Sequence, residues 1–196
     1  MKDFLNSLSL LLLTLTIATF SSQAVIASQN PEELIKDIFA KTGKENLFKN
    51  LKAKSEVESH IDFSEMSKSI LAAEFSKRSS TELKWFEATL KEIITKSVYP
   101  SAPKFLEGVK ITYKKSKISE SDAKISSSVS KKGESTDVDY LLKKINGEWK
   151  VVDVAIDEES WVQSINEKVQ KTIKDKGWAG LKTLLDKRVS ELNKKK

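Results

Sequence analysis

The sequence contains one histidine, His60, and no cysteine among its 196 residues. A Ser–His–Asp relay could run only through His60, and Asp62 is the acidic residue nearest to it on its C-terminal side. Serines are common throughout the chain, but none is marked as a nucleophile, so we favour a surface or capping role for His60. The same counts exclude a multi-histidine metal cluster, a thiolate metal site and a disulfide framework.

Acidic side chains at two other places could do acid–base chemistry. Glu158 and Glu159 are adjacent, but they precede an expected helix, where acidic groups complement the helix dipole. Asp153 lies inside an apolar strand, and a buried acid must be hydrogen-bonded or neutral. We expect its carboxylate to accept hydrogen bonds from the chain around it; the base of a small isomerase is the alternative. The six glycines form no phosphate-binding loop, so we expect no enzyme, no metal and no other cofactor.

The basic residues indicate an anionic partner. Seven lysines lie between positions 110 and 132, against only Glu120 and Asp122. Nucleic-acid binding would favour arginine interleaved with aromatic residues, and the chain has only two arginines, so we expect no nucleic-acid partner. Anionic lipid headgroups or an acidic protein surface fit better, and the candidate contacts are Lys110, Lys114 and Lys124. The alternative is a sheet face that lysine merely keeps solvated.

The first 27 residues have the pattern of a secretory signal peptide. The leucine-rich stretch at 8–20 is too short to span a bilayer, which takes roughly 20 apolar residues. Cleavage after Ala27 would leave residues 28–196 with an unchanged net charge of +6, because Lys2 and Asp3 cancel. An exported chain without cysteine indicates a soluble periplasmic protein, and we expect 28–196 to form a single domain.

Capping signals and apolar spacing predict helices on both sides of a strand-rich middle. Asn30 and Pro31 begin a helix that Gly43 should break, and a short helix should pass through Leu47 and Leu51. Apolar residues at helical spacing predict a long helix from residue 80 to the proline at 100. Two further helices should follow residue 160, with the second beginning at Gly177.

Between these helices the apolar period changes to two. Alternation predicts four strands, over residues 109–113, 124–129, 137–142 and 149–156. Asn146–Gly147 predicts a tight hairpin, and apolar residues on both faces of the fourth strand predict a central position for it. Consecutive strands with short turns predict an antiparallel meander. The expected fold class is therefore α+β, with helices packed on one face of a curved four-stranded antiparallel sheet.

An ordered set of short matches covers residues 31–192. It consists of Asp62-Phe63-x-x-Met66, Leu71, Phe75, Trp85-Phe86, Leu90, Tyr99, Val138-Asp139-Tyr140-x-Leu142, Gly147-Glu148-Trp149-Lys150-Val151-Val152-Asp153-Val154 and Ser160. With this order, length and leader, the chain resembles the MlaC family, also called the toluene-tolerance or ABC-transporter auxiliary component family. It departs from the family's pattern at Ala72 and just before Ser160, where the family usually has glycine.

The resemblance implies a periplasmic phospholipid carrier with a nuclear-transport-factor-2-like cone fold and no catalytic residues. It also implies exchange of lipid with an inner-membrane MCE-type ABC transporter complex and an outer-membrane lipoprotein complex, and we expect a monomer. A non-carrier adaptor module of an envelope complex is the alternative. The candidate lipid-contacting residues, each of which could equally belong to an ordinary core, are Phe86, Leu90, Tyr99, Val109, Ile111, Tyr113, Val129, Tyr140, Val151, Trp161 and Ile165.

Overall fold

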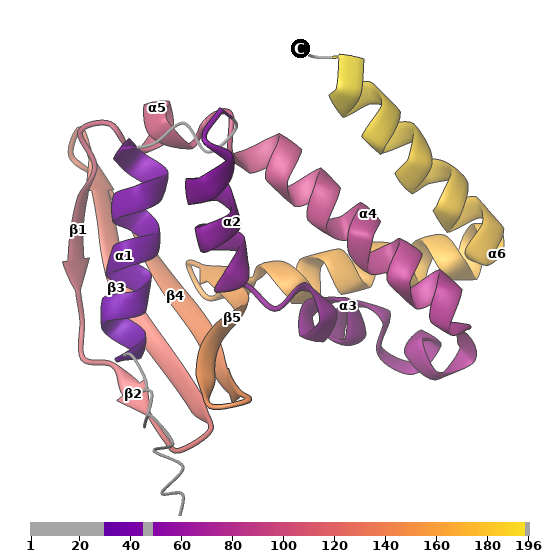
Figure 1. The fold of residues 1–196 in the computed structure, drawn as a ribbon, viewed down its shortest axis with the longest axis horizontal. Coiled ribbons are helices and arrows are strands. Elements are labelled where there is room, and N and C mark those ends of the chain that lie inside the picture. The colour runs from indigo at the N-terminus through magenta and orange to yellow at the C-terminus, as the bar shows by residue number, and fades with distance from the viewer. Residues whose placement is uncertain (1–29, 45–48, 195–196) are drawn as a thin grey trace, which may run out of the picture.

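The computed structural model describes residues 30–44 and 49–194 (Figure 1). The predicted signal peptide, its cleavage site after Ala27, and Leu47 lie outside these residues. The described helices are α1 (Pro31–Lys44), α2 (Leu51–Ser59), α3 (Phe63–Leu71), the 3-10 helix η1 (Ala72–Lys77), α4 (Ser80–Val98), α5 (Ala102–Leu106) and α6 (Trp161–Lys194). The described strands are β1 (Lys110–Tyr113), β2 (Lys117–Ile118), β3 (Asp122–Lys131), β4 (Glu134–Ile145), β5 (Glu148–Ile156) and β6 (Glu159–Ser160).

Local side-chain caps begin the helices of the N-terminal half. In α1, the Asn30 side-chain oxygen accepts the Glu32 N–H at 2.9 Å, as the sequence predicts. Gly43 lies one residue before Lys44, the last described residue of α1, and a Cβ atom at Gly43 would be 3.6 Å from the Leu106 side chain. The long helix α4 begins after Ser79, whose side chain forms a reciprocal capping box with Glu82.

The sheet is antiparallel in the order β1-β3-β4-β5-β6, and β2 pairs with the same edge of β3 as β1. The four predicted strands correspond to β1, β3, β4 and β5, and consecutive long strands pair as a meander. The predicted number of four is wrong, because β2 and β6 add two strands of two residues each. Two residues are too few to show a period-two pattern.

Strand β5 is not central among the long strands. It pairs with β4 on one edge, whereas its other edge pairs with the short β6 and, at Val151, with Ile61 through an isolated bridge. A register shift opposite Leu141 and Leu142 changes the phase of the strand. The apolar pattern on both faces of β5 therefore reflects a β-bulge and packing against the start of α6, with which β5 is in contact.

The C-terminal helix α6 is two helices joined at Gly177, as the sequence predicts. Gly177 has φ 67° and ψ 178°, a backbone conformation that glycine adopts without a steric penalty. Beyond this kink, the Trp178 ring packs edge-on against Trp85 of α4 at 5.8 Å between centroids. The Arg78 guanidinium lies 4.6 Å from the centre of the Trp178 ring. These contacts hold the last part of the chain against α4 (Figure 1).

One hydrophobic core joins the helices to the sheet. Its least exposed members come from α1, α3, α4 and β3, and they include Leu34, Leu71, Phe86 and Ile125, each at most 1% exposed. Helix α1 lies over the β1–β3 part of the sheet and runs roughly along these strands, and α3, α4 and α6 gather beyond the β5 side (Figure 1). Within the described ranges, no helix combines the length and the apolar character needed to cross a membrane.

Candidate functional site

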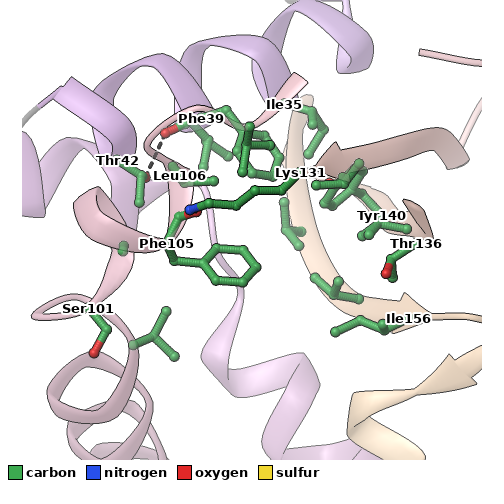
Figure 2. Close-up of a pocket in the computed structure, with 18 of the residues that line it drawn as sticks. Ile35, Phe39, Thr42, Ser101, Phe105, Leu106, Lys131, Thr136, Tyr140 and Ile156 are labelled. Atoms are coloured by element: carbon green, nitrogen blue, oxygen red, sulfur yellow. Dashed lines mark hydrogen bonds between the residues drawn. The ribbon is translucent and has the colours of Figure 1, made fainter. Parts of the chain in front are cut away.

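A cavity of about 920 Å³ lies between α1, the segment around α5, and the sheet face that β3, β4 and β5 share (Figure 2). Helix α1 contributes Ile35, Ile38 and Phe39, three apolar residues at helical spacing. The volume is near the upper end of the roughly 300–1,000 Å³ typical of small-molecule sites.

The strands supply the opposite wall of the cavity, with alternate side chains facing α1. Val129 and Thr136 face each other across β3 and β4, and Val138 pairs in the same way with Ile156 of β5. Tyr140 contacts Phe39 edge-on, with 5.4 Å between ring centroids, so it connects this wall to α1. The cavity is thus enclosed largely by aliphatic and aromatic groups.

Tyr140 and Thr136 carry hydroxyl groups in this wall, and the Tyr140 hydroxyl is neutral at physiological pH. Burial raises the pKa of Tyr140 to about 12, and Ser127 donates a hydrogen bond to its hydroxyl oxygen at 3.4 Å. Thr42 donates its own hydroxyl proton to the Ile38 carbonyl at 2.6 Å. Neither the Tyr140 hydroxyl nor the Thr42 hydroxyl is therefore activated for proton transfer with a ligand in the cavity.

The charged residues that line the cavity are Lys131 at the end of β3, Lys132 in the turn and Glu134 at the start of β4. Three apolar lining residues are unusually exposed, with Phe105 at 65%, Ile156 at 50% and Val98 at 42%. Figure 2 shows Lys131 reaching across toward Phe105. The cavity therefore has an apolar interior and an opening where exposed apolar groups and lysines meet.

Four of the eleven residues predicted to contact lipid line this cavity: Val109, Val129, Tyr140 and Val151. The structure places the other seven elsewhere. Phe86 and Leu90 lie in the core, and Tyr99 is buried in a small cluster with Ala53 and Val57. Ile111 is half-buried on β1.

The remaining three predicted contacts also lie outside the cavity. Tyr113 is half-buried on β1 and has the Lys36 ammonium 5.3 Å from its ring centre. Ile165 packs against the core, and Trp161 is 38% exposed at the start of α6. Sequence reasoning missed the α1 stripe and the α5 segment as cavity walls, although the apolar spacing of α1 was visible in the sequence.

Two of the three lysines predicted to meet a headgroup or a partner are paired on the outer face of the sheet. Lys114 lies 2.6 Å from Asp137, and Lys124 lies 2.5 Å from Asp139. Lys110 is exposed on β1 and, like the other two, does not line the cavity. The lysines that do line it, Lys131 and Lys132, stand two and three residues beyond Val129 at the end of the same strand and its turn.

Asp153 has the structural environment that its sequence context predicts. It is 9% exposed, and its carboxylate accepts hydrogen bonds from the Val154 N–H at 2.8 Å, the Val162 N–H at 3.0 Å and the Ser160 hydroxyl at 2.5 Å. It does not line the cavity. The isomerase alternative therefore lacks its base at the place where a substrate could bind.

The acidic pair before α6 does not serve the helix dipole as we expected. Glu158 lies in the turn between β5 and β6 with φ 70°, and Glu159 belongs to β6. Ser160 caps the helix instead, because its hydroxyl accepts the Gln163 N–H at 2.9 Å. Among the described residues, no group of three or more His, Asp or Glu side chains could hold a metal ion.

Comparisons with known proteins identify the family. The model of the MlaC protein family matches residues 22–187, which is most of the chain. The chain belongs to the MlaC family. Among curated proteins, none matches the sequence. The fold of this MlaC family protein is similar to the solved structure of a phospholipid-binding protein from Ralstonia solanacearum in complex with a phospholipid, with a TM-score of 0.69 and 18% identity over 83% of this chain and 96% of that one.

Proposed function

We propose that this MlaC family protein is a periplasmic phospholipid carrier that holds acyl chains in the cavity between α1, α5 and the sheet. The observation that carries the proposal is the cavity itself, with a volume of about 920 Å³ and a predominantly apolar wall. Membership of a phospholipid-binding family and the fold similarity to a protein with bound phospholipid support it.

The energetics of transfer explain why such a cavity suffices. Each methylene exposed to water costs about 0.8 kcal/mol, so the two tails of a phospholipid expose on the order of 20–25 kcal/mol of unfavourable surface. Apolar walls remove this cost without any placed catalytic group. A methylene group is about the size of a water molecule, which occupies about 30 Å³ in the liquid. The cavity volume therefore accommodates on the order of 30 methylenes, or two ordinary acyl tails.

The remaining steps of the proposal follow from the family. The leader at 1–27 would direct export, and residues 28–196 would act as one monomeric lipid-binding domain with the cone shape of that fold. The carrier would exchange lipid with an MCE-type ABC transporter complex in the inner membrane and with a lipoprotein complex in the outer membrane. An ATPase in the partner complex would supply the driving force, because no glycine-rich phosphate loop occurs in this sequence.

Organic extraction of the purified mature protein, followed by mass spectrometry, tests the proposal. We expect stoichiometric co-purifying phospholipid, and uptake of fluorescent phospholipid from vesicles by the delipidated protein. Recovery of no lipid together with no uptake would contradict the carrier and favour the adaptor alternative.

A matched pair of variants on β4 tests whether lipid uptake depends on the cavity. Thr136 lines the cavity, whereas its neighbour Ser135 is exposed and hydrogen-bonds to Ser128 of β3. Thr136→Trp should fill the cavity and reduce bound lipid severalfold. Ser135→Trp adds the same group on the opposite face of the same strand and should leave uptake near the wild-type level. Equal uptake by both variants would place lipid somewhere else.

A further inference from the structure

Lys131 occupies a distinctive position at the opening of the cavity. Its backbone ends β3, and its side chain extends to the segment α5, where the ammonium donates hydrogen bonds to the Phe105 carbonyl at 2.8 Å and the Lys104 carbonyl at 3.2 Å (Figure 2). The Phe105 ring lies 6.0 Å from the same nitrogen. The four-carbon stem therefore lines an apolar cavity while the charge is held at its edge.

These contacts fix the ammonium and leave it capable of binding an anion. A lysine ammonium has three N–H donors and accepts no hydrogen bond. The two carbonyls of α5 take two of the donors, and within the described part of the chain no third acceptor contacts Lys131. Carbonyl oxygens carry no net charge, and among the described residues no carboxylate forms a salt bridge with Lys131, although Glu134 is its cross-strand neighbour.

The surrounding charges favour an anionic ligand at this place. Lys132 lines the same opening, and Glu134 is the acidic residue among the described lining residues. On the outer face of the sheet, by contrast, Lys114 and Lys124 already pair with aspartates. The net positive charge at the cavity edge lies directly beside the apolar space that would hold acyl chains.

We propose that Lys131 is the headgroup anchor of the lipid site: held by the α5 carbonyls, it donates its third N–H to a phosphate oxygen of a phospholipid whose tails fill the cavity. This inference rests on the proposed carrier function and adds a residue that selects phosphodiester lipids over uncharged lipids with the same tails. Its positioning before binding means that little side-chain entropy is lost when the headgroup arrives.

The experiment compares two ligands with identical pyrene-labelled acyl chains, phosphatidylglycerol and diacylglycerol, binding to delipidated full-length mature protein. Lys131→Met should weaken phosphatidylglycerol binding by about 10- to 100-fold, the range for a lost hydrogen bond between charged groups, and leave diacylglycerol binding within about twofold. Lys132→Met is the matched control, with the same charge change at the next position, and should cost less than about threefold. Lys131→Arg should retain most of the preference for phosphatidylglycerol.

Each outcome decides between distinct explanations. Equal weakening of both ligands by Lys131→Met would show that the lysine only holds α5 in place, and equal effects of the two Met variants would show that diffuse charge is responsible; either overturns the anchor. Wild-type protein that binds neither ligand would overturn the carrier function and the anchor with it. If Lys131→Met does not fold, Lys131→Gln replaces it, because its amide can still donate to the α5 carbonyls without a charge.

Discussion

Replacing Asp153 by alanine should destabilise the protein strongly without removing lipid binding. The substitution deletes the acceptor of three hydrogen bonds, one of which comes from the buried backbone N–H of Val162. Hydrogen bonds to a charged group contribute about 1.5–3 kcal/mol each, and a buried donor left unsatisfied costs about 1–3 kcal/mol. Because the three bonds share one acceptor and do not add fully, we expect a loss of about 3–5 kcal/mol.

In a domain of this size, each kcal/mol shifts the melting temperature by about 2–4 °C, so Asp153→Ala should lower it by about 6–20 °C. Asp153→Asn keeps the oxygen that accepts the Val154 and Val162 N–H groups, so it should cost less than half as much. Ser160→Ala removes one bond to Asp153 and the cap on Gln163, which should cost about 1–2 kcal/mol.

Thermal and urea unfolding followed by circular dichroism measure these differences, and vesicle uptake at 15 °C measures lipid binding on the folded variants. Asp153 does not line the cavity, so uptake per folded molecule should match the wild type. A melting temperature of Asp153→Ala within 2 °C of the wild type would refute the role of this carboxylate in joining β5 to α6. Loss of uptake by the folded Asp153→Asn variant would refute its separation from the lipid site.

Three further predictions concern backbone strain and pH. Ala72 has φ 47° and ψ −122°, which costs about 1–3 kcal/mol, so Ala72→Gly should raise the melting temperature by about 2–4 °C after the entropy of glycine is subtracted. Glu158 is the second central residue of the β5–β6 turn at φ 70°, and Glu158→Gly should stabilise by about 0.5–1 kcal/mol, measured by urea unfolding. Burial, with Lys150 and Lys41 nearby, lowers the pKa of His60 below 6.5 in the folded state. The unfolded chain therefore binds a proton at His60 at higher pH than the folded protein does, so the free energy of unfolding falls as the pH drops through 6.5. In the His60→Gln variant, the urea midpoint should depend less on pH between 7.5 and 5.5. The same pH dependence in the variant and the wild type would contradict this.

The backbone conformation can be compared at the two places where the sequence departs from the pattern of the MlaC family, Ala72 and the residue before Ser160. The resemblance implies glycine at Ala72 and just before Ser160; in this protein Ala72 has φ 47°, whereas Glu159, the residue before Ser160, lies in β6 directly after the positive-φ turn residues Asp157 and Glu158. Glycine adopts such conformations without a steric penalty, whereas a side chain adds strain. The departure at Ala72 therefore coincides with local backbone strain, and neither Ala72 nor Glu159 lines the cavity.

Local signals predicted most of the elements because each depends on neighbouring residues. Asn30 and Pro31 begin α1, Asn146–Gly147 turns β4 into β5 with positive φ at both residues, and Gly177 divides α6. The two-residue strands and the five-residue α5 escaped prediction, since no periodic pattern exists at that length. Their formation depends on pairing with β3 and β5 and on packing of α5 against α1.

The cavity could not be predicted from any local pattern. Ile125 and Val129 lie on the same face of β3, four residues apart, and both belong to the apolar stripe that alternation identifies. Ile125 is fully buried in the core, whereas Val129 lines the cavity. The sequence determines which face a side chain occupies, but the distance to the opposing helix decides whether that face meets a packed core or an open space.

The lysines also separate what the sequence determines from what the tertiary structure decides. The sequence by itself determined an α+β chain with the order of its four long strands, a family resemblance, a net charge of +6 and residues that fit no familiar catalytic centre. Tertiary structure alone paired Lys114 and Lys124 with aspartates of β4 and brought Lys131 to the carbonyls of α5. Charge and apolar content are properties of composition, whereas a cavity with an ammonium at its edge requires segments distant in sequence to meet at a fixed separation.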